Sequence, residues 1–216
     1  MNKLLCPSMM CVDYDALKEK VIELDRAGID IFHCDIMDGM FVPNITMGTL
    51  DVKAIKKNTN KLVDVHLMIE NPLNKIDLFI DAGADLIYVH PESERYTIKT
   101  LQYIINRNRL AGIAINPDTT VETVYEMLNL VSYILVMSVT PGYAGQQFLE
   151  FTVDKIKKLV DLKKQFTYKI IVDGGITPEK IDELSAIGVD GFILGTSVLF
   201  NQTKDYQEII KEIRGL

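Results

Sequence analysis

The sequence predicts an α/β protein with a single domain, residues 1–216, folded as one (β/α)8 TIM barrel. Short apolar segments alternate with amphipathic segments along the whole chain, which is typical of repeated βα units. Eight such strands within about 210 residues suit a closed eightfold barrel. An open flavodoxin-like sheet is the alternative, but eight strands would make it crowded.

The apolar segments are the expected strands. Most are nearly continuous runs of Val, Ile, Leu and Met, as in parallel strands that are covered on both faces. They occupy residues 4–10, 31–37, 62–69, 86–90, 111–116, 133–139, 169–173 and 191–195.

The amphipathic segments are the expected helices, at residues 14–27, 73–82, 98–106, 121–128, 152–164, 178–187 and 205–213. In the first, Leu17, Val21 and Leu24 recur at helical spacing among charged residues. Three helices end at a glycine shortly before a strand, as expected of short αβ loops: Gly28, Gly83 and Gly188. The sequence contains no linker or low-complexity segment, so we expect one domain.

Composition and charge restrict the class of partner. A net charge of −7 argues against a nucleic-acid partner and offers no long-range attraction to a phosphorylated substrate. Any phosphate would therefore be held by local backbone dipoles. The three cysteines form no CxxC pair, and the sequence has neither a signal-peptide core nor an apolar run of ~20 residues. We expect a reduced, cytoplasmic protein without a membrane partner.

Four polar residues at expected strand ends form a candidate metal site. His33 and Asp35 are two residues apart on one strand, so both point into the barrel, and His66 and Asp173 lie at a similar height on other strands. Two histidines with two carboxylates suit a divalent ion such as Zn, Fe(II), Mn or Co better than Mg. Either histidine alone is as well explained as a buried core residue, whereas the whole set favours a metal.

Three glycine-containing loops follow the last three strands and form a candidate phosphate site. Glycine lets backbone amides approach an anion closely, and barrels often bind phosphate near the loops after strands 7 and 8. Each loop alone is as well explained as a plain turn, whereas the three together favour an anion site. They contain Gly142, Tyr143, Ala144 and Gly145, then Gly174 and Gly175, then Gly195 and Thr196.

Four motifs in this order resemble the ribulose-phosphate 3-epimerase family over residues 7–201. The most specific is His-Cys-Asp-Ile-Met-Asp-Gly-Met-Phe-Val-Pro-Asn at residues 33–44. The others are Asp-Val-His-Leu-Met-Ile at 64–69, Met-Ser-Val with Pro-Gly at 137–142, and Val-Asp-Gly-Gly at 172–175.

The resemblance implies a ribulose-phosphate-binding barrel with one divalent metal ion per chain, held by His33, Asp35, His66 and Asp173. It implies that Asp35 is the general base and Asp173 the general acid, exchanging roles with direction. It further implies that Ser8 and His66 contact a phosphorylated ketose, that the glycine loops hold its phosphate, and that the chain forms a homodimer or hexamer. Met37, Met68 and Met137 would line the site, although such methionines are as often core residues.

Some residues depart from the family pattern, and these departures bear on which sugar phosphate is the substrate. Met40 stands where the pentose-phosphate enzymes usually carry His, and the Ser8-Met9-Met10-Cys11 segment differs from their Ser-Ile-Leu-Ser. Three sets of residues instead resemble the D-allulose-6-phosphate 3-epimerase branch, which epimerises a ketohexose 6-phosphate to D-fructose 6-phosphate: Pro7-Ser8 with Met10-Cys11, His90-Pro91-Glu92, and Gly195-Thr196-Ser197 with Leu199-Phe200-Asn201. We therefore expect that activity, with ribulose-phosphate 3-epimerase as the alternative.

Two other classes are considered. A decarboxylase of the orotidine-phosphate type would need an Asp-x-Lys-x-x-Asp array on the third strand, which has no lysine here. A binding protein without catalysis would be expected to lack one of the two aspartates, and both are present.

Overall fold

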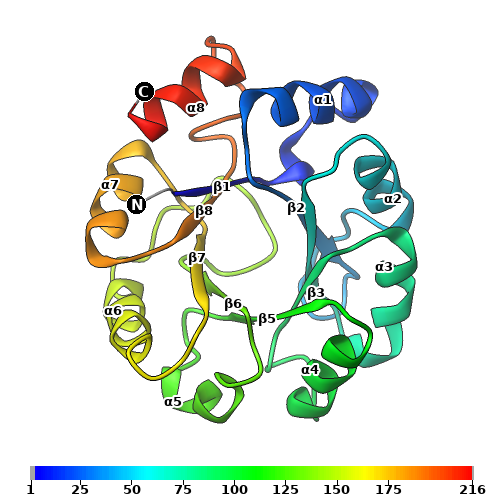
Figure 1. The fold of residues 1–216 in the computed structure, drawn as a ribbon, viewed down its shortest axis with the longest axis vertical. Coiled ribbons are helices and arrows are strands. Elements are labelled where there is room, and N and C mark those ends of the chain that lie inside the picture. The colour runs from blue at the N-terminus through cyan, green and yellow to red at the C-terminus, as the bar shows by residue number, and fades with distance from the viewer. Residues whose placement is uncertain (1–2, 216) are drawn as a thin grey trace.

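The computed structural model describes residues 3–215 and has eight parallel strands in one sheet that curls into a nearly closed barrel (Figure 1). The strand order is β1-β8-β7-β6-β5-β4-β3-β2, and β1 meets β2 through a bridge between Ser8 and His33. The strands are β1 (Leu4–Pro7), β2 (Ile31–Met37), β3 (Leu62–Met68), β4 (Leu86–Val89), β5 (Leu110–Ile115), β6 (Tyr133–Met137), β7 (Lys169–Asp173) and β8 (Gly191–Leu194). The predicted barrel is confirmed.

A ring of helices surrounds the barrel (Figure 1). The helices are α1 (Leu17–Ala27), α2 (Thr49–Lys57), α3 (Ile76–Ala82), α4 (Thr97–Asn106), α5 (Val121–Val124), α6 (Thr152–Leu162), α7 (Pro178–Ile187) and α8 (Tyr206–Arg214). Within residues 3–215, none of them combines the length and apolar character needed to cross a membrane.

Several expected boundaries were wrong. The first strand stops at Pro7, and a 3-10 turn, Met9–Cys11, replaces its expected end. Turns of the same kind replace the expected starts of α1 and α3 and the expected end of α5. Helix α2 was missed altogether, because its apolar residues Leu50, Val52 and Ala54 alternate with polar ones and Leu50 is 80% exposed, so a helical spacing is obscured.

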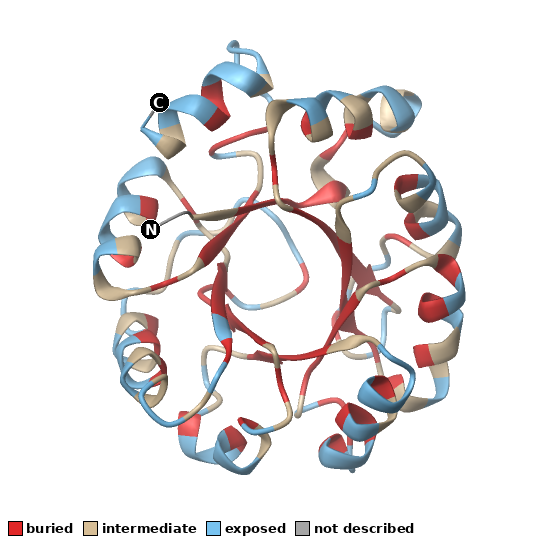
Figure 2. Ribbon diagram, viewed as in Figure 1, coloured by how far each residue is buried: buried red, intermediate tan, exposed pale blue. Residues whose placement is uncertain are grey.

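The core has two layers. One layer fills the barrel and includes Tyr88, Leu135 and Ile171, and the other lies between the sheet and the helices. Figure 2 shows this arrangement: strands are buried on both faces, and each helix is buried on its inner side only. The near-continuous apolar strands of the sequence follow from this double burial.

Three aspartates tie neighbouring strands together at the amino end of the barrel. Each follows a C′ glycine with positive φ, two residues earlier, and accepts a backbone N–H from the preceding strand. Asp30 accepts from Leu5 at 2.9 Å, Asp85 from Val63 at 2.9 Å and Asp190 from Ile170 at 2.7 Å. The repeated Gly-x-Asp motif therefore ends a helix and pairs two strands at once.

We expect Asp85→Ala to lower the free energy of unfolding by about 1–3 kcal/mol, because it leaves the Val63 amide without its acceptor and removes the carboxylate that pairs with Lys56. Asp81→Ala, on the exposed face of α3, is the matched control and should change stability by less than about 0.5 kcal/mol. Urea unfolding of both variants measures the difference. Equal effects would contradict a structural role for the motif.

Candidate active site and metal-binding cluster

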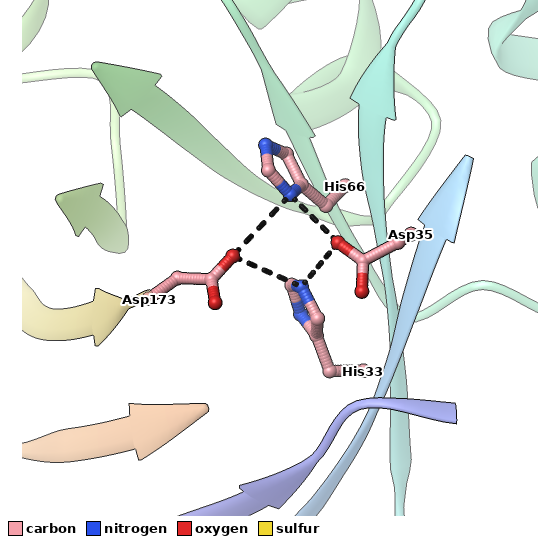
Figure 3. A group of neighbouring side chains, drawn as sticks. All are labelled: His33, Asp35, His66 and Asp173. Atoms are coloured by element: carbon pink, nitrogen blue, oxygen red, sulfur yellow. Dashed lines mark hydrogen bonds and ion pairs between the residues drawn. The ribbon is translucent and has the colours of Figure 1, made fainter. Parts of the chain in front are cut away.

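The register between β2 and β3 gathers acids and imidazoles inside the barrel. Asp35 lies opposite His66, and His33 lies opposite Asp64. Since side chains alternate along a strand, all four point to the same side, into the barrel. Asp173, at the end of β7, faces Asp35 across the two imidazoles (Figure 3).

The side chains of His33, Asp35, His66 and Asp173 converge on one point. One ligand atom from each lies within 4.8 Å of all the others. Asp35 Oδ1 is 3.2 Å from His33 Nε2 and 3.1 Å from His66 Nδ1, and Asp173 Oδ2 is 4.0 and 3.9 Å from the same nitrogens. Donors about 2.1 Å from a shared ion lie roughly 3–4 Å apart, so the cluster fits a metal ion.

The outer nitrogen of each imidazole has its own neighbour. His33 Nδ1 lies 2.6 Å from Asp64 Oδ1, and His66 Nε2 lies 2.8 Å from His90 Nε2. His90 Nδ1 in turn lies 3.3 Å from Glu92 Oε2. Neither Nδ1 contact is aligned as a good hydrogen bond, so both are close approaches of a ring nitrogen to a carboxylate oxygen.

Asp64, His90 and Glu92 were not among the predicted site residues. The sequence contained a signal for Asp64 and for His90, but none for Glu92. Asp64 is two residues before His66 and therefore shares its face, and His90 is the third histidine of the chain, at an expected strand end.

Burial and neighbouring charge separate the two acids. Burial raises the pKa of Asp173 from 3.8, and repulsion by Asp35 adds to it, bringing the pKa to about 7. Burial acts in the same direction on Asp35, but the charge and hydrogen bonds of His33 and His66 outweigh it and hold the pKa of Asp35 well below its usual range. Ser8 Oγ also donates to Asp35 Oδ2 at 2.6 Å. At neutral pH Asp35 is ionised and Asp173 is close to half protonated.

The two imidazoles also differ. Burial opposes the charged form of His33, but Asp64 and Asp35 outweigh it and raise its pKa well above 6.5. For His66, burial dominates and lowers the pKa to about 3, so this ring is neutral at physiological pH.

A pocket opens above the cluster at the carboxyl ends of the strands. His33 and His66 lie fully buried at its base. Its wall also contains Cys11 and Gln146, which the sequence did not predict as site residues. The predicted residues that line it are Ser8, Asp35, Met37, Met68, Met137, Gly142, Tyr143, Ala144, Gly145, Asp173, Gly174, Gly175, Gly195 and Thr196.

The loop after β7 requires glycine at two positions. Gly174 and Gly175 have φ of 113° and 61°, and a Cβ at either would lie 2.4 Å from Val139 Cγ2 or the Phe148 nitrogen. Ser138 Oγ donates to the backbone oxygen of Gly174 at 2.6 Å and so ties this loop to β6. Among the described residues that line the pocket, none is Lys or Arg.

The loop after β2 contacts the loop after β6, which lines the pocket. Asn44 Nδ2 donates to the Gly142 oxygen at 2.8 Å, and Tyr143 Oη donates to the Pro43 oxygen at 2.6 Å. Met40, which departs from the family pattern, is 75% exposed on this loop and does not line the pocket.

The protein is an eightfold barrel with a cluster of two histidines and two aspartates below a glycine-lined pocket. These features define a class of barrel proteins suited to divalent metals and small anionic ligands. The sequence also matches the ribulose-phosphate 3 epimerase family over residues 4–199. The chain belongs to this family, and is therefore an isomerase of the epimerase type.

Individual relatives agree with this membership. The chain is 36% identical to "Ribulose-phosphate 3-epimerase" of Aquifex aeolicus, covering 99% of this chain and 96% of the relative. It is 38% identical to the chloroplastic "Ribulose-5-phosphate-3-epimerase" of Arabidopsis thaliana, covering 98% and 76%. A solved structure titled "3-Hexulose-6-Phosphate Synthase" has a TM-score of 0.73 over 100% of this chain and 99% of its own, at 18% identity, which shows the fold alone.

We expect metal-free Asp173→Asn to be more stable than the metal-free wild type at pH 8. Because the pKa of Asp173 is raised from 3.8 to about 7 on folding, its contribution to stability is complete below about pH 4 and is lost as pH rises through 7. The difference should be roughly 2–4 kcal/mol at pH 8 and close to zero at pH 4, measured by urea unfolding with a chelator present. Asp182→Asn, on the exposed surface of α7, should show no such pH dependence. A difference between Asp173→Asn and wild type that is equal at both pH values would contradict the assigned cause.

Proposed function

We propose that the protein interconverts D-ribulose 5-phosphate and D-xylulose 5-phosphate by epimerisation at C3, with one bound divalent metal ion. The observation that carries this proposal is the placement of Asp35 and Asp173 on facing sides of one buried cluster at the pocket base. Inversion at C3 needs a proton removed from one face and another returned to the opposite face, and two facing carboxyl groups suit that task.

His33 Nε2, His66 Nδ1 and one oxygen each of Asp35 and Asp173 are the donors that would hold the metal. Imidazole with carboxylate suits Zn, Fe(II), Mn or Co, and the donor set does not favour one of them. A bound divalent ion supplies Lewis-acid stabilisation of negative charge on the substrate oxygens.

Asp35 is the general base and Asp173 the general acid in one direction, and they exchange roles in the other. Asp35 holds a low pKa beside the imidazoles, so it is ionised and able to accept the C3 proton. Without metal, Asp173 has a pKa of about 7, so this carboxyl group is suited to carry the proton that a general acid donates. Ser8 holds one oxygen of Asp35 and would also contact the substrate.

The glycine loops after β6, β7 and β8 would hold the phosphate through backbone N–H groups, since the described wall offers no Lys or Arg. These loops contain Gly142, Tyr143, Ala144, Gly145, Gly174, Gly175, Gly195 and Thr196. Met37, Met68 and Met137 form apolar walls beside the acids and would limit water near C3.

The pentose substrate replaces the hexose preference expected from the sequence. Relatives that match nearly the whole chain are named for ribulose phosphate. Met40, which departs from the pattern of the pentose-phosphate enzymes, is 75% exposed and does not line the pocket, so it gives no reason to exclude the pentose. The homodimer or hexamer stays a prediction from the family resemblance, and the cytoplasmic location stays a prediction from the composition.

Asp35→Asn and Asp173→Asn should each lower kcat by at least about 10²–10⁴-fold, because each removes one of the two proton-transfer groups. Epimerisation in D2O should place deuterium at C3 for the wild type, and NMR follows the exchange. Asp182→Asn on α7 removes an exposed carboxylate and should keep full activity. Near-normal turnover by either active-site variant would refute the two-acid scheme.

The choice of sugar is tested by comparing kcat/KM for D-ribulose 5-phosphate and D-allulose 6-phosphate with the same metal-loaded protein. We expect a preference for the pentose of at least about tenfold, the scale set by one additional carbon in a fitted pocket. The reverse ratio would restore the hexose interpretation. No exchange or turnover with either sugar would favour a binding protein without catalysis.

A further inference from the structure

His90 and Glu92 lie next to the cluster but have no part in the mechanism above. His90 is fully buried, directly after β4, and its ring lies between two others. The ring of Phe41 lies 4.9 Å from it, and the ring of His66 lies 5.0 Å from it, measured between centroids. A buried imidazole is costly unless its nitrogens have partners, so its two contacts require an explanation.

The contact between His66 and His90 leaves room for one proton. Their Nε2 atoms are 2.8 Å apart, and their ring planes differ by 29°, so the lone pair of one can face the N–H of the other. Two N–H groups would repel each other here, and so would two lone pairs. One ring must therefore donate and the other accept.

The direction of this hydrogen bond decides whether His66 can bind a cation. If His66 donates from Nε2, its Nδ1 presents a lone pair beside Asp35 Oδ1, 3.1 Å away. If His90 donates, a neutral His66 must carry its proton on Nδ1, which then points into the cluster. Only the first arrangement leaves the fourth donor of the cluster free.

Glu92 favours the first arrangement. Its Oε2 lies 3.3 Å from His90 Nδ1, and a carboxylate at that distance stabilises a proton on Nδ1 and repels a lone pair there. A neutral His90 with its proton on Nδ1 has a lone pair on Nε2, so it must accept from His66.

The other oxygen of Glu92 is held separately. Glu92 Oε1 accepts from the backbone N–H of Asn116 at 3.1 Å and from the hydroxyl of Thr119. Both partners belong to the loop after β5, so the carboxylate is fixed with Oε2 towards His90. The loops after β4 and β5 thus determine the orientation of a group that never reaches the pocket.

We propose that Glu92 and His90 are positioning residues that fix the tautomer of His66: Glu92 holds the proton of His90 on Nδ1, His90 accepts from His66 Nε2, and His66 Nδ1 is left as a donor for the metal. This inference rests on the metal site of the proposed function and extends it by two residues. Supporting contacts of this kind are general for metal-binding imidazoles.

Glu92→Gln is the sharpest test. Asn116 N–H and the Thr119 hydroxyl both donate, so the new amide should turn its oxygen towards them and its NH2 towards His90 Nδ1. We call the contacts from Glu92 through His90 to His66 the relay. The new NH2 reverses it: His90 carries its proton on Nε2, and His66 Nδ1 becomes protonated. We expect the affinity for Zn²⁺, measured by competition with a chromophoric chelator, to fall about 10–100-fold.

Glu94→Gln is the matched control. Glu94 is 8% exposed in the same loop, and its carboxylate accepts from the backbone N–H groups of Leu73 and Tyr96. The Glu94→Gln variant therefore loses a buried carboxylate but keeps the contacts of Glu92, His90 and His66. Its stability should fall, whereas its Zn²⁺ affinity should stay within about twofold of the wild type.

A second readout separates tautomer from folding. The chain has three histidines, so long-range ¹H–¹⁵N spectra of the metal-free protein, in which no ion imposes a tautomer on His66, can be assigned ring by ring. We expect the His90 proton on Nδ1 in the wild type and on Nε2 in Glu92→Gln. A wild-type proton on Nε2 would overturn the proposal, even if Glu92→Gln failed to fold.

The remaining outcomes are also decisive. Unchanged Zn²⁺ affinity in Glu92→Gln, or an equal loss in Glu94→Gln, overturns the relay while the proposed function stands. Weaker affinity with an unchanged His90 tautomer overturns it as well. A wild-type protein that binds no divalent metal overturns the proposed metal site and, with it, this inference.

Discussion

The parallel register between β2 and β3 is the constraint on which the site depends. It sets Asp35 beside His66 and His33 beside Asp64, all inside the barrel. The alternate residues of the same strands, such as Ile36 and Leu67, pack outwards beneath the helices. A slip of one residue would bury the charged set among the helices and turn the apolar set inwards. The hydrophobic core therefore fixes the positions of the polar cluster, and neither can be changed without the other.

Concentrating these groups has an energetic cost that the rest of the barrel must offset. Asp35 and Asp173 present carboxylate oxygens within 4.8 Å of one another, with little contact with water. Their repulsion, together with burial, keeps the pKa of Asp173 far above that of Asp35. This asymmetry gives one base and one acid at neutral pH without any difference in residue type. The negative charge of Asp35 and Asp173 destabilises the metal-free barrel. The same charge suits these two carboxylates to bind a cation and to transfer a proton.

The two sides of the pocket use different chemistry. On the side of β2, β3 and β4, side chains contact one another in a chain that runs from Asp35 through the buried rings of His66 and His90 to Glu92. On the side of β6, β7 and β8, the backbone of glycine loops forms the wall. Hydrogen bonds from Asn44 and Tyr143 join the loops of both sides. Proton transfer needs fixed side chains, whereas an anion can be held by backbone amides that any sequence supplies once glycine permits the close approach.

The sequence by itself determined the eight strands and the residues at their carboxyl ends, because double burial leaves a continuous apolar pattern and strand polarity places the functional residues. It did not reveal α2, in which the apolar residues Leu50, Val52 and Ala54 alternate with polar ones. It also did not distinguish Asp64 and Glu92 from ordinary acids, since their roles depend on which imidazole each one faces. Asp64 faces His33 on the neighbouring strand. Glu92 faces His90 only two residues away, but His90 gains its role from His66 on the neighbouring strand. Only the closed barrel and its register decided them, because contacts between strands are set by how the sheet pairs and not by local spacing.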